Sequence, residues 1–149
     1  MSANTAPIFP ITPTTATASL TAVSACTTRG PIAHASLTAT PCFAVALAPV
    51  STNGKRVDVI QVNAASTAIG ASTAAQLVLV WLSNGTTAYV IDEIQVTAQT
   101  PNAVLPSFVS SRAYSNLVLK PTDTLWVSTT VTTTASTTAL SVTLFGGDY

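Results

Sequence analysis

The chain has 149 residues, enough for one domain with a sizeable core, and only 7% of them are charged, with a net charge of zero. Without a basic or acidic field we expect no nucleic-acid partner. The five carboxylates are dispersed and the six glycines are scattered, so we also expect no metal and no cofactor. The longest strongly apolar run, residues 77–82, is far shorter than the ~20 residues of a membrane helix, so we expect no membrane partner either. An isolated domain usually carries about 25% charged residues, so copies or partners are expected to cover much of this surface.

The first fifteen residues, MSANTAPIFPITPTT, contain three prolines and no charge. Proline removes a backbone donor and holds φ near −65°, so residues 1–15 are predicted to form an extended arm. The stretch lacks the basic and continuous apolar regions of a secretory signal. At ~3.1–3.3 Å per residue the arm can reach a neighbouring subunit and add to it as a strand; an arm folded onto its own domain is the alternative. The arm residues expected to bind the partner are Pro7, Ile8, Phe9, Pro10, Ile11 and Pro13.

Residues 16–149 are predicted to form a single all-β domain. Thr and Ser are abundant, whereas Lys and Glu are scarce, which favours strands over helices. Alternating patterns separated by Gly, Pro and Asn turns predict about eight or nine short strands, typical of a β-sandwich or jelly roll. The predicted strands span residues 16–25, 32–38, 42–48, 56–64, 75–82, 87–96, 114–119, 125–131 and 138–145.

The segment after the first predicted strand holds both cysteines and the only histidine. Cys26 and Cys42 are too few for a disulfide scaffold or a zinc site, and two free thiols are favoured over one disulfide. His34 would have to be the base of any Ser-His-Asp triad, but no serine lies in a Gly-x-Ser-x-Gly turn. We therefore expect no catalytic residue and no enzyme.

In the central stretch VDVIQVN, alternation places the odd-numbered residues of 57–62 on one face and the even-numbered ones on the other. Both faces carry apolar residues, which predicts a further layer outside the sandwich. The next segment, residues 66–75, is predicted to be a loop rather than a helix, because it contains Gly70 and several threonines.

The clearest local prediction is a hairpin across residues 76–96, with its turn at Asn84-Gly85. Asp92 and Glu93 are adjacent, so on a strand they point to opposite faces and cannot act as a close carboxylate pair. Instead, we expect one of them to be solvated and one to pair with Arg56 or Arg112.

Five aromatic residues lie on strand-like segments, where core packing is favoured over a carbohydrate-binding groove. They are Trp81, Trp126, Phe43, Phe108 and Phe145. The threonine-rich stretch 128–138 is predicted to be a strand edge or hairpin rather than a disordered linker.

Several stretches together resemble small structural proteins of tailed bacteriophages. These are the start MSANTAPIFP, the strand GKRVDVIQV, the hairpin VWLSNGTTAYVIDEIQVTAQTPN and the final GGDY. The resemblance covers most of the chain but not residues 27–49. It implies a virion component built on a jelly roll or sandwich, a capsid decoration or cement protein, commonly trimeric. The implied partners are copies of itself and the major capsid protein or other virion proteins, in a virion assembled in the bacterial host cytoplasm.

The expected function is therefore a non-enzymatic structural role, stabilising a phage head through an oligomeric sandwich and its arm. Two alternatives are a tail or baseplate component, and a carbohydrate- or receptor-binding module that uses Trp81 or Trp126.

Overall fold

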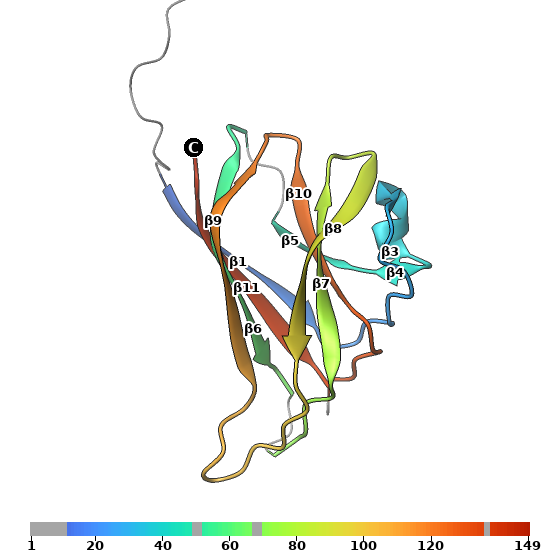
Figure 1. The fold of residues 1–149 in the computed structure, drawn as a ribbon, viewed down its shortest axis with the longest axis vertical. Coiled ribbons are helices and arrows are strands. Elements are labelled where there is room, and N and C mark those ends of the chain that lie inside the picture. The colour runs from blue at the N-terminus through green and yellow to red at the C-terminus, as the bar shows by residue number, and fades with distance from the viewer. Residues whose placement is uncertain (1–11, 49–51, 67–69, 136–137) are drawn as a thin grey trace, which may run out of the picture.

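The computed structural model describes residues 12–48, 52–66, 70–135 and 138–149, and within them the chain is an all-β sandwich, as predicted (Figure 1). The first sheet has the strand order β1-β11-β6-β9, and the second has the order β2-β8-β7-β10-β5. The first sheet's strands are β1 (Thr12–Leu20), β11 (Leu140–Asp148), β6 (Lys55–Ala64) and β9 (Val109–Leu119). The second sheet's strands are β2 (Ile32–Ala33), β8 (Thr87–Val96), β7 (Gln76–Ser83), β10 (Thr124–Thr129) and β5 (Val45–Ala48).

The long strands pair as one folded ribbon. The β7–β8 hairpin forms its closed end, and the antiparallel ladders β6–β9, β5–β10 and β1–β11 follow outward from it. Successive ladders alternate between the sheets, so residues far apart in sequence form the core. That core lies between the sheets and is mostly apolar; Leu20, Ile60, Val80, Leu125 and Leu144 are all completely buried in it.

The turn that closes the ribbon lies at the predicted place. Gly85 has φ +86°, and Asn84 Oδ1 accepts hydrogen bonds from the amides of Thr86 and Thr87 at 3.0 and 2.9 Å. Glycine adopts this left-handed conformation at low cost, and an asparagine side chain readily caps such a turn. The Asn-Gly signal in the sequence therefore identified the hairpin correctly.

Strand β6 does not alternate strictly, so the prediction of two regular faces across 57–62 was wrong. Its ladders with β11 and β9 both shift register between Val57 and Val59. Against β11 the extra residue is Asp58, which changes which residues point inward, so Val57, Ile60 and Val62 all lie in the core. Against β9 the extra residues belong to β9, where 114–116 lie opposite Asp58 alone. Opposite the bulge, a Cβ on Gly146 would collide with the carbonyl oxygen of Arg56, so only glycine fits there.

A further layer does lie outside the sandwich, but over the second sheet rather than over β6. It is built from the 3₁₀ helix η1 (His34–Leu37) and the short hairpin of β3 (Thr38–Ala39) and β4 (Cys42–Phe43). Its apolar side packs on β7 and β8 in a second buried cluster of Cys26, Leu37, Cys42, Ala44, Leu79, Trp81 and Ala88. We call these segments, residues 26–44, the cover. Strand β7 is therefore buried on both faces, which explains its continuous apolar run.

The other sequence predictions differ from the structure mainly at their ends. The strand predicted at 114–119 begins at Val109, and the stretch 32–38 contains β2 and η1 rather than one strand. Residues 66 and 70–75 contain no helix in the part of the chain that the structure describes. Within the described residues of the stretch 128–138, only 128–129 belong to a strand. Residues 130–133 run beside 23–26 through hydrogen bonds such as Thr133 N–H to Val23 O at 2.9 Å.

The expected boundary of the arm lies inside β1. Residues 12–15 are already paired with β11, and Pro13 lies opposite Gly147. Pro13 is therefore part of an edge strand, where a missing amide hydrogen is tolerated. The other arm residues, Pro7, Ile8, Phe9, Pro10 and Ile11, lie outside the described residues.

Candidate functional site

The two cysteines are joined, so the prediction of two free thiols was wrong. Cys26 and Cys42, sixteen positions apart in the sequence, form a disulfide with their Cα atoms 4.1 Å apart. The β3–β4 hairpin brings Cys42 beneath the segment that carries Cys26, and the Cys26 amide donates to Thr129 O at 2.7 Å. The disulfide therefore ties the first residue of the cover to its β3–β4 hairpin, and the Cys26 amide joins the cover to the end of β10.

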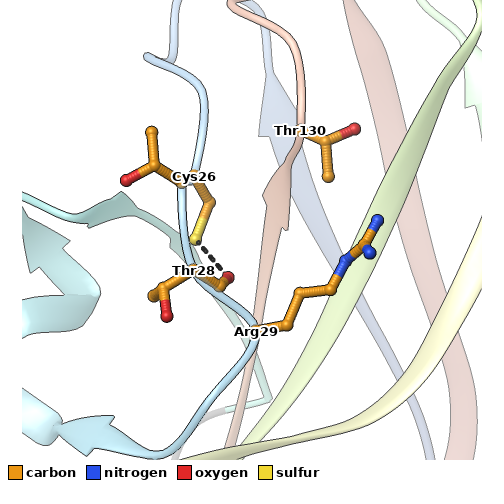
Figure 2. Close-up of a pocket in the computed structure, with 5 residues that line it drawn as sticks. Cys26, Thr28, Arg29 and Thr130 are labelled. Carbon is orange, nitrogen blue, oxygen red and sulfur yellow. Dashed lines mark hydrogen bonds between the residues drawn. The ribbon is translucent and has the colours of Figure 1, made fainter.

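Beside the disulfide lies an open depression of about 480 Å³, lined by Cys26, Thr27, Thr28, Arg29 and Thr130 (Figure 2). The dashed line in Figure 2 joins Cys26 Sγ to Thr28 O at 3.3 Å; a disulfide sulfur carries no hydrogen, so this is a close contact. Arg29, the only charged residue in the lining, forms an ion pair with Glu93 at 3.1 Å. The depression therefore offers no unpaired charge to a ligand.

A histidine of the cover and a serine of β7 lie at hydrogen-bond distance, an arrangement that the sequence did not indicate. His34 Nδ1 lies 2.8 Å from Ser83 Oγ, although the residues are 49 positions apart. Ser83 is completely buried, and its oxygen also accepts the Gly85 amide at 3.2 Å. The His34 ring meets Trp126 edge-on, with centroids 5.5 Å apart. A nucleophile must reach its substrate, whereas Ser83 is completely buried, so this contact is better suited to holding the hairpin turn against the cover.

Asp92 and Glu93 point to opposite faces, as predicted, and each finds a different partner. Asp92 Oδ2 accepts hydrogen bonds from Arg112 Nε at 3.0 Å and from Tyr114 Oη at 2.8 Å, both on β9 of the other sheet. Burial, and then the hydrogen bond to Asp92, raise the pKa of Tyr114 well above its usual value. This cluster joins the two sheets along one flank of the sandwich. Of the two predicted partners, Arg112 is correct, whereas Arg56 pairs with Asp58 at 2.7 Å.

Charge is almost fully paired within the chain. Eight of its ten charged residues form four ion pairs: Arg29–Glu93, Lys55–Asp148, Arg56–Asp58 and Arg112–Asp92. The remaining two, Lys120 and Asp123, share a turn in which Asp123 Oδ2 accepts the Lys120 amide at 3.1 Å. No group of three or more potential metal ligands occurs among the described residues. The surface therefore has very little net field in any direction.

The five aromatic residues divide between core and surface. Trp81 is completely buried, with its indole N–H donating to Ser128 Oγ at 2.9 Å, and Phe108 is also buried. Trp126 is half-buried, whereas Phe43 and Phe145 are about two-fifths exposed, at 38% and 41%. Trp81 therefore cannot contact a carbohydrate.

The outer face of the first sheet has no cover among the described residues and carries uncharged side chains over most of its area. Thr15, Thr17 and Ser19 on β1 lie beside Phe145, Thr143 and Ser141 on β11, and these beside Val59, Gln61 and Asn63 on β6. Val109 and Val118 on β9 complete this face and are more than half exposed. Phe145, Val109 and Val118 give this face exposed apolar side chains that suit packing against another protein.

None of the described segments forms a helix long and apolar enough to cross a membrane. Comparison with models of known protein families, with curated proteins and with solved structures gave no match to this chain.

Proposed function

We propose that the chain is a non-enzymatic structural protein of a tailed-phage virion, a decoration or cement protein that stabilises the head shell. The ribbon of four successive ladders, rolled so that they alternate between two sheets, supports a jelly-roll form of the sandwich. Jelly rolls are frequent in viral capsid proteins, but they also occur in lectins and cupins. The fold alone therefore does not decide the function.

The observation that carries the proposal is the neutral surface. Four internal ion pairs leave almost no charge to steer a nucleic acid or a charged substrate. At the same time, nine large apolar side chains are exposed in the described residues. They are Phe43, Tyr89, Ile91, Val104, Leu105, Val109, Val118, Val131 and Phe145. A monomer with so little charge would be poorly protected against association, whereas a subunit of a shell uses such a surface as an interface.

The mechanism is burial of surface without chemistry. The partners are further copies of the chain, in a small symmetric oligomer such as a trimer, and the major capsid protein or other virion proteins. Each contact would bury ~1,200–2,000 Å², and its affinity would depend on how well it packs. Repetition of the contact over a whole particle makes the total binding free energy large. Assembly would take place in the cytoplasm of the bacterial host.

Quantitative mass spectrometry of purified particles of the virus that encodes the chain tests the proposal. A cement protein should be present at a fixed stoichiometric ratio to the major shell protein, and particles lacking it should release DNA at lower temperature. A small number of copies, with unchanged head stability, would favour the tail or baseplate alternative. Absence of the chain from purified particles would refute a virion role.

A further inference from the structure

The Asn84-Gly85 turn of the β7–β8 hairpin brings together the groups of an intramolecular reaction. Asn84 and Gly85 are exposed, whereas the preceding Ser83 is completely buried. In an Asn-Gly pair the glycine amide nitrogen can attack the side-chain carbonyl carbon of the asparagine, because no side chain on the glycine shields the nitrogen. The attack closes a succinimide ring and releases ammonia, and water then opens the ring. In this turn, both the carbonyl and the attacking nitrogen have partners that favour the reaction.

The side-chain carbonyl of Asn84 is polarised by two backbone amides. Asn84 Oδ1 accepts hydrogen bonds from the N–H groups of Thr86 at 3.0 Å and Thr87 at 2.9 Å. When a nucleophile adds to Cγ, the carbon becomes tetrahedral and Oδ1 takes up the negative charge. Two amide donors aimed at that oxygen stabilise the charge, as the donors of an oxyanion hole do. The Cγ atom of Asn84 is therefore activated toward attack.

The attacking nitrogen, that of Gly85, has a route for its proton. Its N–H donates to Ser83 Oγ at 3.2 Å, and Ser83 Oγ lies 2.8 Å from His34 Nδ1. When the neutral imidazole carries its hydrogen on Nε2, Nδ1 accepts the Ser83 hydroxyl, and Ser83 Oγ accepts the Gly85 amide. As the nitrogen attacks, its proton passes to Ser83 Oγ while the hydroxyl proton passes to His34. A positioned general base of this kind accelerates a reaction by roughly 10²–10⁴-fold.

The cover holds His34 and the turn in this arrangement. The His34 amide donates to Thr86 O at 2.8 Å, and the His34 ring packs edge-on against Trp126 with centroids 5.5 Å apart. Within the turn, the Asn84 amide donates to Thr87 O at 3.2 Å. Figure 1 shows the β7–β8 turn beside η1, the helix that begins with His34. The base and the two donors are therefore oriented before the reaction starts, which lowers its entropic cost.

Two other asparagines of the same chain offer internal comparisons. Asn53 is exposed and is also followed by a glycine, but its side chain forms no hydrogen bond to any residue that the structure describes. Asn102 Oδ1 accepts two backbone amides at 2.8 and 2.9 Å, as Asn84 Oδ1 does, but an alanine follows Asn102. Over the described ranges, Asn84 alone combines a following glycine, two donors on its carbonyl and a serine–histidine pair.

We propose that Asn84 is a self-modification site, which the chain converts to aspartate through a succinimide formed with the Gly85 nitrogen. In the first step the bond from this nitrogen to Cγ forms, and the side-chain nitrogen leaves as ammonia with the proton that Gly85 gave up. In the second step water adds to Cγ, the bond from Cγ to the Gly85 nitrogen breaks, and that nitrogen recovers a proton from the water. One water is consumed and one ammonia released, with no change of oxidation state.

The same two amides favour one of the two possible products. Water can open the succinimide at Cγ, which gives aspartate, or at the former backbone carbonyl, which gives isoaspartate. The amides of Thr86 and Thr87 lie at the Cγ oxygen, so they stabilise the oxyanion of the first route only. The new carboxylate keeps both amides as charge-assisted partners, and it adds one negative charge to a chain of net charge zero. This chemistry does not depend on the proposed virion role.

Peptide mapping by mass spectrometry of the full chain, folded in buffer or unfolded in urea and sampled over time, tests the proposal. In the folded chain, Asn84 should react at least about tenfold faster than Asn53 and faster still than Asn102, whereas in urea Asn84 and Asn53 should react at similar rates. The aspartate fraction at position 84 should also be higher in the folded chain than in urea. Folded Asn84 that reacts no faster than Asn53, a preference that persists in urea, or an unchanged product ratio would each overturn the inference.

Two variants test the proton route. Ser83→Ala should slow the reaction of Asn84 about tenfold or more, whereas Ser141→Ala, a serine of β11, should leave it unchanged. His34 is only half-buried, so His34→Ala tests the route even where Ser83→Ala destabilises the hairpin. His34→Ala should slow the reaction to a similar extent, and imidazole added to the solution should restore the rate in this variant but not in Ser83→Ala. An unchanged rate in His34→Ala, or a reduced rate that imidazole does not raise, would overturn the role of the serine–histidine pair.

Discussion

Replacement of Ser128 by alanine should destabilise the protein far more than a serine-to-alanine change elsewhere. Ser128 and Trp81 are both completely buried, and the Trp81 indole N–H donates to Ser128 Oγ at 2.9 Å. Ser128→Ala leaves that N–H buried without a partner, which costs about 1–3 kcal/mol. With a urea m-value of roughly 2 kcal/mol/M, the unfolding midpoint should fall by about 0.5–1.5 M at unchanged m.

A double-mutant cycle isolates the hydrogen bond from other effects. In a Trp81→Phe background no indole N–H remains, so the further change Ser128→Ala should cost less than about 0.5 kcal/mol and give a coupling of about 1–2 kcal/mol. Ser141→Ala, at a half-exposed position on β11, is the control and should stay within about 0.5 kcal/mol of the wild type. A Ser128→Ala midpoint equal to that of the control, or a coupling near zero, would refute the role assigned to this bond.

Three further predictions concern the bulge, the Asp92–Arg112–Tyr114 cluster that joins the sheets, and the cover. Gly146→Ala should cost more than about 3 kcal/mol of unfolding free energy, because a backbone carbonyl occupies the space of the new Cβ. Gly85→Ala meets no atom and should cost only about 1–2 kcal/mol, because of its positive φ. Equal urea midpoints for the two variants would contradict this. Burial and a hydrogen bond to a carboxylate raise the pKa of Tyr114, so its contribution to stability is complete below about pH 10 and is lost as the pH rises further. The Tm of Tyr114→Phe should therefore fall less steeply above about pH 10 than the Tm of the wild type. An equal fall in Tm for both proteins would contradict the role given to Tyr114. Reduction of the Cys26–Cys42 disulfide should lower the unfolding free energy by about 3 kcal/mol, since it closes a loop of sixteen residues; an identical midpoint with and without reductant would show that the cover does not depend on it.

The sequence predicted best what depends on local pattern. The Asn84-Gly85 turn and the flanking β-branched residues predicted the β7–β8 hairpin almost to the residue, because turn chemistry and alternation act over a few positions. The opposite orientation of Asp92 and Glu93 followed from strand geometry alone. Both features are consequences of the backbone and do not require knowledge of distant segments.

Features that depend on distant segments were not predictable in the same way. The bulge at Asp58 exists because Gly146, some ninety positions later, lets β6 approach β11 closely. The disulfide and the His34–Ser83 contact depend on how the cover folds over β7. The sixteen-residue spacing of the cysteines fits either two thiols or a bond, and only the fold brings them together. The edge position of β9 likewise follows from the strand order, which no single segment specifies.

The central claim is that this nearly uncharged domain associates with further copies of itself. Sedimentation equilibrium of the full chain over roughly 1 to 100 µM tests the claim most directly, because association shifts with concentration by mass action. The account predicts a mass that rises with concentration to a multiple of the 15.1 kDa monomer. A mass of 15.1 kDa at every concentration would contradict it.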